Sequence, residues 1–351
     1  MEPMPDDSFQ EPGEPFASYQ NELCKYLLSL LNTLHPLTRI DALVALQQKG
    51  KLLASSELQT PNSSVSHGSW SLAVLLVALQ VSPTVDPRIA NTVAVALECF
   101  ICALDLLDDV EDEDQTPPVL SLGAPRVLNV STALLALSQH ALLSLSTYGA
   151  PSALVFRLLE AFQQAALTAT GGQHKDLLAE QRPVSDITTE ECITIAAEKA
   201  GALLRLACDA GAICAGADKE ECELFSALGE FLGIAHQLDN DSHDLYHILQ
   251  GESSQLYLDT KPVVKSVKTD LIRQKKTLPV VLAARSRSTL QKPLPLDDSG
   301  QWEAIYDSLR EGIIATWGIS LLYKERARES LQKIEARRPV SYLLRLLLGF
   351  T

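Results

Sequence analysis

Two clusters of acidic residues, far apart in the chain, are the parts of this sequence best suited to chemistry. The first lies in the run DLLDDVEDED and includes Asp105, Asp108, Asp109 and Asp112. On a helix, positions three and four apart share a face, so these four carboxylates form one acidic stripe. The preceding residues, VALECFICALDLL, are apolar enough for a protein core, where bare carboxylates are costly. A neutralising cation is therefore expected beside them.

The second cluster lies in HQLDNDSHDL, again directly after apolar sequence. Gln237, Asp241 and Asp244 share one helical face with Asn240 beside them, whereas Asp239 points elsewhere. Two such stripes facing each other would repel unless divalent cations bridged them. Mg²⁺ prefers oxygen ligands and is often bound by one or two carboxylates together with phosphate oxygens. The pattern therefore predicts a diphosphate held by metal ions between two helices.

Five sequence elements, in matching order, resemble those of the trans-isoprenyl diphosphate synthases, or polyprenyl synthetases. They are DDVED at 108–112, GQHKDL at 172–177, KAGAL at 199–203, QLDNDSHD at 237–244 and RQKKTLP at 273–279. The corresponding family elements are DDxxD, GQxxDL, KTGAL, QxxDDxxD and GKxTLP. This chain departs from them by having Ala200 for Thr, Asn240 for Asp and Gln274 for Gly. The resemblance covers about residues 70–285 and implies an all-α bundle around a central cavity.

The resemblance also implies roles for the matching residues. Two Mg²⁺ ions would be bound by Asp108, Asp109 and Asp112, and a third by Asp241 and Asp244 with Asn240 as a neutral ligand. Lys199 and Lys275 would hold the diphosphate of an allylic prenyl substrate, and Gln173 and Gln237 would lie near its reacting carbon. The expected catalytic groups are the three aspartates of the first motif with Lys199, Gln237 and Asp241. Ionisation would leave an allylic cation, and the site would stabilise the charge on the leaving diphosphate.

The basic residues that bind a second diphosphate, that of isopentenyl diphosphate, do not match the family. The early stretch reads Ser-His-Gly-Ser-Trp-Ser at 66–71, and no Lys or Arg occurs between Lys51 and Arg88. The next basic residue after Asp112 is Arg126. Three functions remain open: prenyl transfer to isopentenyl diphosphate or another acceptor, cyclisation as in class I terpene synthases, and non-catalytic prenyl diphosphate or partner binding. Prenyl transfer is placed first because most of the resemblance is to that family.

The depth of the substrate channel can also be predicted by resemblance. Bulky aromatic residues one turn before the first motif shorten the product in this family, and here those positions are Ala103 and Leu104. The channel is therefore expected to be deeper than a C15 chain needs, with Phe100 as its floor. Aromatic residues are few, which disfavours elaborate cyclisation guided by cation–π contacts, although Trp70 and Phe156 are candidates to line the pocket.

The elements that position these residues are all expected to be helices. The sequence is rich in Leu and Ala and shows no period-two alternation. An acidic, Pro-rich tail at 1–18 is expected to precede a single helical domain at 19–351. Helices are predicted at 70–81, 88–113, 125–147, 151–169, 186–216, 218–248 and 301–331.

Composition excludes several other functions. The 29 Lys and Arg residues against 44 Asp and Glu residues give a formal net charge of −15, which disfavours nucleic acid and anionic lipid as partners. The seven cysteines show no metal-ligand spacing and are expected to be buried, reduced thiols of a cytoplasmic protein. No signal peptide is expected, and the apolar segment 90–107 is interrupted by polar residues, which favours a core helix over a membrane span. The family resemblance implies a homodimer.

Overall fold

A long central helix, α4 (Pro87–Glu111), carries the first acidic motif at its C-terminal end. In the computed structural model, which describes residues 14–51, 70–249, 275–286 and 299–350, almost every side chain from Ala90 to Ala103 is buried. The helix begins where the side chain of Asp86 accepts a hydrogen bond from the Arg88 amide and Pro87 occupies the first turn. It ends just before Glu113, whose positive φ of 54° turns the chain away. The apolar N-terminal part thus anchors the acidic end.

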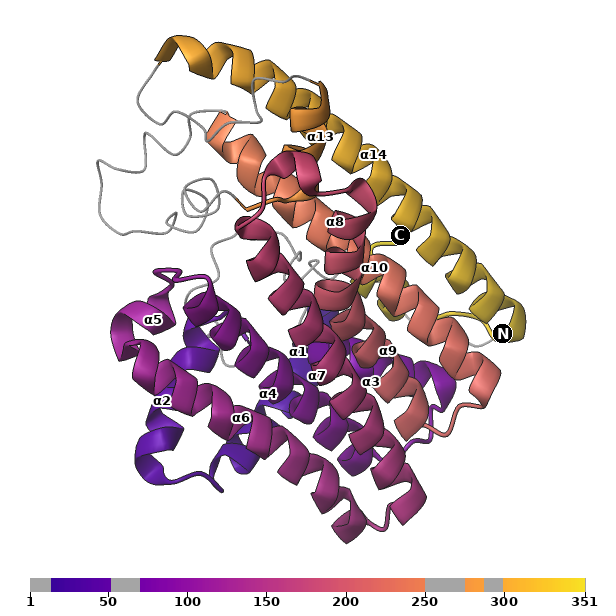
Figure 1. Ribbon diagram of the computed structural model, residues 1–351. Helices are drawn as coiled ribbons and strands as arrows, with labels where there is room; N and C mark the ends of the chain where they lie inside the picture. Colours follow the sequence, from indigo (N-terminus) through magenta and orange to yellow (C-terminus); the bar gives the residue numbers. More distant parts are fainter. Residues whose placement is uncertain (1–13, 52–69, 250–274, 287–298, 351) are drawn as a thin grey trace.

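Several of the remaining helices pack around α4, and others pack against those (Figure 1). Those in the N-terminal half are α1 (Glu14–Leu31), α2 (Pro36–Gln48), α3 (Trp70–Val81), α5 (Pro117–Leu122), α6 (Ala124–Ser144) with the 3₁₀ turn η2 (Leu145–Tyr148), and α7 (Ser152–Glu180). Those in the C-terminal half are η3 (Val184–Asp186), α8 (Thr189–Ala196), η4 (Ala197–Gly201), α9 (Ala202–Cys214), α10 (Lys219–Leu249), α13 (Leu278–Ser286), α14 (Ser299–Arg337) and α15 (Tyr342–Leu347). No strand occurs in the described ranges, which confirms the predicted all-α fold.

Several element boundaries differ from the sequence prediction. Helix α1 begins at Glu14, so residues 14–18 are helical rather than part of the tail, and Phe16 is buried. The helix predicted to end near 169 continues as α7 to Glu180, because Gly172 is used for a close helix contact rather than for a turn. The helix predicted over 186–216 is interrupted by η4, a five-residue π-helical segment. The short helices α5 and α15, with six residues each, give too few turns for a clear periodic pattern.

The π-helical segment η4 lies between α7 and α10, and glycines permit the contact on both sides. A Cβ atom on Gly172 of α7 would lie 2.8 Å from Cβ of Glu198. A Cβ atom on Gly233 of α10 would lie 2.4 Å from the carbonyl oxygen of Ala200. Real Cβ atoms do not approach so closely, so the backbone of η4 is held between two helices that have no side chain at the point of contact.

Two helical stretches of the described residues are long and apolar enough to cross a membrane, by length and composition alone. The more apolar window, in α4, is 83% buried inside the protein, as expected of a core helix. The other, Ala124–Tyr148, covers α6 and η2 and is 44% buried. The seven cysteines are all free, and six of them are buried, in line with the sequence prediction of reduced thiols.

Candidate active site

The acidic stripe on α4 divides into two faces, each paired with lysines. On one face, Asp108 lies 3.3 Å from the Nζ atom of Lys199, and Asp112 lies 2.5 Å from that of Lys275. Asp112 is almost fully buried, whereas the side chain of Asp108 is 41% exposed. Gln173 of α7 donates a further hydrogen bond of 3.2 Å to Asp112. This face therefore gathers five residues that the sequence predicted to act together.

The other face of α4 carries Asp105 and Asp109. Lys51 binds Asp105 at 2.7 Å, and Lys49 binds Asp109 at 2.7 Å. The Thr116 hydroxyl donates a hydrogen bond of 2.8 Å to the same Asp109 carboxylate, which is 6% exposed. Burial lowers the pKa of Lys51, but Asp105 and the nearby Glu98 raise it by more, so the lysine stays charged. Sequence reasoning missed both lysines, because they precede α4 by a long stretch of chain.

Lys199 connects α4 to α7. It lies in η4 and donates a hydrogen bond of 2.9 Å to Asp176 of α7 in addition to its contact with Asp108. Burial lowers the pKa of the Lys199 ammonium, but the carboxylates of Asp108 and Asp176 more than offset this and hold the pKa above its ordinary value. The cation is therefore fixed in its charged form at the side of the acidic motif. Asp176 belongs to the GQHKDL element, but no role was predicted for it.

The second acidic cluster lies on α10, as predicted. Gln237 donates a hydrogen bond of 2.9 Å to Asp241, and Asn240 contacts His236 at 3.2 Å. Asp239 points away from them and binds Lys324 of α14, which confirms the predicted orientation. The side chain of Asp244 lies outside the described residues, although its backbone is part of α10.

Helix α10, which carries the second cluster, packs directly against η4, the segment that carries Lys199. Burial raises the pKa of the Cys192 thiol on α8 to about 12, and the next contribution comes from the carboxylate of Asp241. Glu191 and Asp176 raise it further. Asp241 of α10 and Asp176 of α7 are thus both within electrostatic range of one atom, and Asp176 is bonded to Lys199. The helix that carries the second acidic cluster is therefore a direct neighbour of the segment whose lysine contacts Asp108.

Comparison with known proteins is consistent with this arrangement. The polyprenyl synthetase family model matches residues 70–301, which is more than half of the chain. The chain belongs to the polyprenyl synthetase family. It is 30% identical over 228 residues to a geranylgeranyl diphosphate synthase of Mycobacterium tuberculosis, covering 64% of this chain and 60% of that protein. The match thus spans less than two thirds of that relative's length.

The chain is also similar to a second named protein and to a solved structure. A tryptophan prenyltransferase, ComQ of Bacillus spizizenii, is 32% identical over 155 residues, covering 44% of this chain and 50% of that protein. A crystal structure of a geranylgeranyl pyrophosphate synthase superposes with a TM-score of 0.73 at 19% identity, covering 97% of this chain and 99% of that one. The structural likeness confirms the predicted fold, an isoprenoid-synthase-type bundle.

The donor atoms of this polyprenyl synthetase suit Mg²⁺ only in part. Among the described residues, no three Asp, Glu, His or Cys side chains converge on one point that could hold a metal ion. The sequence predicts a neutralising cation beside the first motif, and in the structure lysines contact all four of its aspartates. Asp108 and Asp112 face Lys199 and Lys275, so they can exchange lysine for metal if the lysines move to phosphate oxygens. Both oxygens of Asp109 are bonded to Lys49, and we leave it out of the proposed ligand set.

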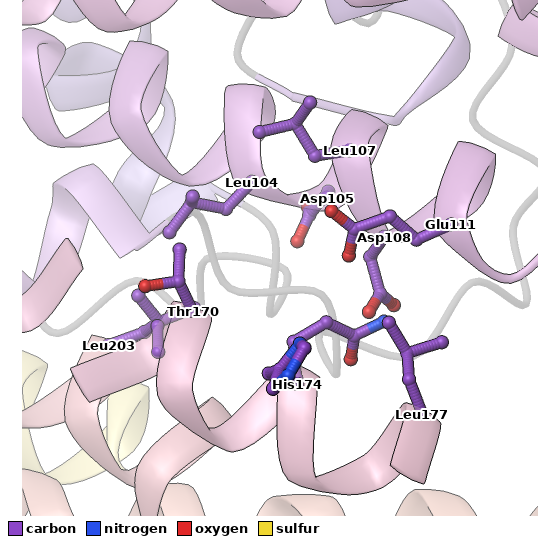
Figure 2. Close-up of a pocket in the computed structure, with 11 residues that line it drawn as sticks. Leu104, Asp105, Leu107, Asp108, Glu111, Thr170, His174, Leu177 and Leu203 are labelled. Carbon is purple, nitrogen blue, oxygen red and sulfur yellow. The ribbon is translucent and has the colours of Figure 1, made fainter. Parts of the chain in front are cut away.

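A cavity of about 290 Å³ opens between α4 and α7 beside the first motif (Figure 2). Asp108 and Glu111 lie toward one end, with His174 across from them, and Leu104, Thr170 and Leu203 lie toward the other. The lining continues with Asp105, Leu107, Ala169, Gln173 and Leu177. The cavity therefore combines an acidic end with an apolar end, as an amphipathic substrate requires.

Four of the predicted lining residues do not line this cavity. Phe100 and Ala103 are both buried. Phe100 lies one helical turn before Leu104, and its ring packs edge-on against Phe162 with ring centroids 5.4 Å apart. Phe156 is 67% exposed on the outer face of α7. Trp70 instead packs edge-on against His236. Sequence reasoning missed Phe162, because nothing in its neighbourhood marks it as a partner of Phe100.

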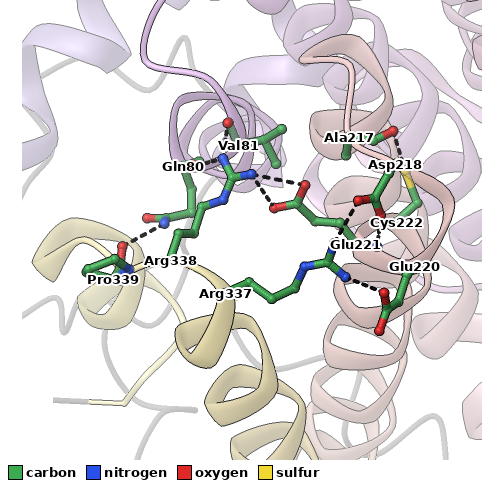
Figure 3. Close-up of polar contacts among 10 residues, drawn as sticks. All are labelled: Gln80, Val81, Ala217, Asp218, Glu220, Glu221, Cys222, Arg337, Arg338 and Pro339. Carbon is green, nitrogen blue, oxygen red and sulfur yellow. Dashed lines mark hydrogen bonds and ion pairs between the residues drawn. The ribbon is translucent and has the colours of Figure 1, made fainter.

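Arg337 and Arg338 form ion pairs with acidic residues at the start of α10 (Figure 3). They bind the N-terminal end of α10, which is about 30 Å along the helix from Asp241. Arg338 contacts Glu221 at 3.0 Å and donates to the carbonyl groups of Gln80 and Val81 at the end of α3. The Arg338 side chain is partly buried and Glu221 is 3% exposed, so this residue is a structural link rather than a diphosphate contact or a simple surface group.

Replacing Arg338 with methionine is expected to lower the free energy of unfolding by about 2–3 kcal/mol, because Glu221 would stay buried without its cation. Arg337 provides the matched control, since its partners Asp218 and Glu220 are exposed. Arg337→Met is expected to cost no more than about 1 kcal/mol. Urea denaturation of both variants measures the difference, and equal losses would contradict the assignment.

Proposed function

We propose that this protein is a Mg²⁺-dependent prenyltransferase that ionises an allylic prenyl diphosphate and passes the prenyl cation to an acceptor. The observation that supports this most directly is the convergence of Asp108, Asp112, Lys199, Lys275 and Gln173 at the acidic end of a cavity with an apolar far end. An anionic head group and a hydrocarbon tail need such a pair of environments.

The lysines have a direct role in this proposal. The Nζ atoms of Lys199 and Lys275 donate hydrogen bonds to oxygens of the diphosphate, whose charge grows as the C1–O bond breaks. Asp176 keeps Lys199 protonated and in place while this happens. Gln173, buried and bonded to Asp112, supplies an uncharged polar group near the reacting carbon. The leucines of the cavity exclude water from the cation.

Asp108 and Asp112 of α4 and Asp241 of α10 are the proposed ligands of Mg²⁺, with Asp244 and Asn240 as further candidates on α10. When bound, Mg²⁺ neutralises the diphosphate and stabilises it as a leaving group. The resemblance implies three ions. All the proposed side chains donate oxygen atoms, which suits this hard cation.

The acceptor is the least determined part of the proposal. Among the described residues near the motif, Lys49 and Lys51 are bound to Asp109 and Asp105, and Arg126 is bound to Asp41 of α2. A relative named for tryptophan prenylation supports an acceptor other than isopentenyl diphosphate. We therefore propose that isopentenyl diphosphate is a poor acceptor compared with an uncharged nucleophile.

Product analysis tests the function. The purified protein is incubated with Mg²⁺ and C10 to C25 prenyl diphosphates, with and without isopentenyl diphosphate or tryptophan-containing peptides, and products are identified by mass spectrometry. Diphosphate release that needs both Mg²⁺ and an acceptor supports prenyl transfer, and EDTA should abolish it. Hydrocarbon products without an acceptor would instead indicate a cyclase. Binding without turnover under every condition would indicate a non-catalytic protein.

The Phe100–Phe162 pair is proposed as the floor of the channel, because it closes the space between α4 and α7 below Leu104. Phe100→Ala is expected to shift the preferred substrate toward longer chains by at least one isoprene unit, and Phe162→Ala should do the same from the other wall. Competition between C15, C20 and C25 diphosphates measures the preference. The matched control is Phe156→Ala, which removes an exposed ring from the same helix. An unchanged preference in both channel variants would refute the placement.

A homodimer is also part of the proposal. Leu128 and Leu143 of α6 and Leu167 of α7 are large apolar residues that are at least 42% exposed in the single chain. Burying such side chains between two copies would remove them from water. Light scattering of the purified protein gives the mass directly.

A further inference from the structure

Two neighbouring residues of α7 are bonded to two neighbouring residues of η4, with their charges reversed. The Nζ atom of Lys175 lies 2.5 and 2.7 Å from the two carboxylate oxygens of Glu198. The Nζ atom of Lys199 lies 2.9 Å from Asp176. Successive side chains of a helix point in different directions, so the two bridges reach η4 along different lines. Together they restrict both the position of the segment and its rotation.

The segment that carries Lys199 needs such restraint. A π-helical turn inside α-helical structure is rare and holds one more residue per turn than its neighbours. Lysine has a long, flexible side chain, so its ammonium is placed only as well as its backbone is held. Gly172 and Gly233 allow close packing on both sides of η4, but they offer no directional bond. The bidentate contact of Lys175 with Glu198 supplies such a directional bond, at the residue directly before Lys199.

We propose that Lys175 and Glu198 are a positioning pair for the reaction, which sets the Nζ atom of Lys199 between Asp176 and Asp108. Neither residue of the pair is a lining residue of the cavity beside the motif. This inference rests on the proposed function, because it gives Lys199 the task of holding the diphosphate. The pair acts through Lys199, and loss of the pair would leave the diphosphate with a less well-placed cation.

Because the Lys175–Glu198 pair is partly exposed, its effect on the reaction can be distinguished from its effect on folding stability. The side chains of Lys175 and Glu198 are 49% and 26% exposed, and pairs of this kind contribute about 0–1 kcal/mol to folding. Misplacing a group that contacts a substrate can cost up to about 100-fold in rate. A positioning role therefore predicts a kinetic effect much larger than the effect on stability.

The experiment compares charge reversals with a matched control pair. Arg182 and Glu191 form an ion pair at 2.5 Å between the end of α7 and α8, with side chains that are 42% and 27% exposed. The variants are Lys175→Glu, Glu198→Lys and the double swap, alongside Arg182→Glu, Glu191→Arg and their double swap. Each variant is assayed for kcat and KM with a C20 prenyl diphosphate and the acceptor that product analysis identifies. Thermal unfolding of each variant is measured as well.

Each single reversal at 175 or 198 is expected to lower kcat/KM by about tenfold, mainly by raising KM for the prenyl diphosphate. The double swap should recover to within about threefold of the parent, because it restores the pair without changing the net charge. The Arg182 and Glu191 variants should stay within about twofold of the parent, which excludes a general effect of charge. Melting temperatures should be similar across both sets.

Two results would overturn the inference: a double swap as impaired as its worse single variant, or equal losses in the control set. Lys199→Met separates this inference from the proposed function. If Lys199→Met loses activity while Lys175→Glu matches the parent, only the positioning pair is refuted. If Lys199→Met itself matches the parent, the proposed role of Lys199 is refuted as well.

Discussion

Replacement of Asp108 by asparagine is expected to reduce prenyl diphosphate ionisation by about 1,000-fold or more. Asp108 is the proposed Mg²⁺ ligand that faces the cavity, and its side chain is 41% exposed there. Losing one charged group from a site that stabilises a leaving anion typically costs about 100- to 1,000-fold, and loss of a metal ligand belongs at the upper end. The measurement is diphosphate release at saturating Mg²⁺ and substrate. Because asparagine has the same size, the free energy of unfolding should change little.

Asp109 is the internal control for this prediction. It adjoins Asp108 in the sequence but is turned toward Lys49 and Thr116. Asp109→Asn should therefore lower stability, since it leaves Lys49 without its buried partner, while the Mg²⁺ concentration for half-maximal activity stays near that of the parent. On α10, Asp239→Asn should leave activity unchanged and Asp241→Asn should abolish it. Equal loss of activity in the Asp108 and Asp109 variants would contradict the division of α4 into two faces.

The sequence was sufficient for the helix that carries the first motif and for its partners on the cavity side. The residue spacing placed Asp108 and Asp112 on one face, and the family elements identified Gln173, Lys199 and Lys275, all of which the structure brings to Asp108 or Asp112. The sequence did not predict that two further lysines would pair with Asp105 and Asp109 on the other face. Lys49 and Lys51 reach α4 from the end of α2, and a contact so distant in sequence leaves no local pattern.

The π-helical segment was also beyond prediction from the sequence. The run from Thr189 to Cys214 favours helix throughout, and no proline marks a break near Lys199. The extra residue of η4 depends on contacts made by Gly172 and Gly233, which belong to other helices. In a single sequence, a glycine within a helix signals lower helix propensity rather than a close contact with a particular neighbour. The helix predicted over 151–169 likewise continues through Gly171 and Gly172 to Glu180.

The second large effect is expected from Gly233→Ala. The new methyl group would lie 2.4 Å from the carbonyl oxygen of Ala200 and 2.7 Å from Cα of Gly201. Both are backbone atoms of the junction that carries Lys199, so no side chain can rotate to relieve the clash. Overpacking of this kind costs about 1–3 kcal/mol and occasionally more, and the better helix propensity of alanine returns only about 1 kcal/mol. We expect a net loss near 2 kcal/mol in the free energy of unfolding, measured by urea denaturation.

The same substitution should also reduce activity, because α10 can accommodate the methyl group only by moving away from η4. That movement separates Asp241 on α10 from Lys199 on η4, which the proposed function requires to act on one diphosphate. Gly318→Ala is the matched control: it also lies within a helix, α14, but a Cβ atom there meets nothing within 4 Å. It should stabilise the protein by up to about 1 kcal/mol and leave kcat/KM unchanged. If Gly233→Ala behaved like Gly318→Ala in both measurements, the close contact between α10 and η4 could not be what positions the site.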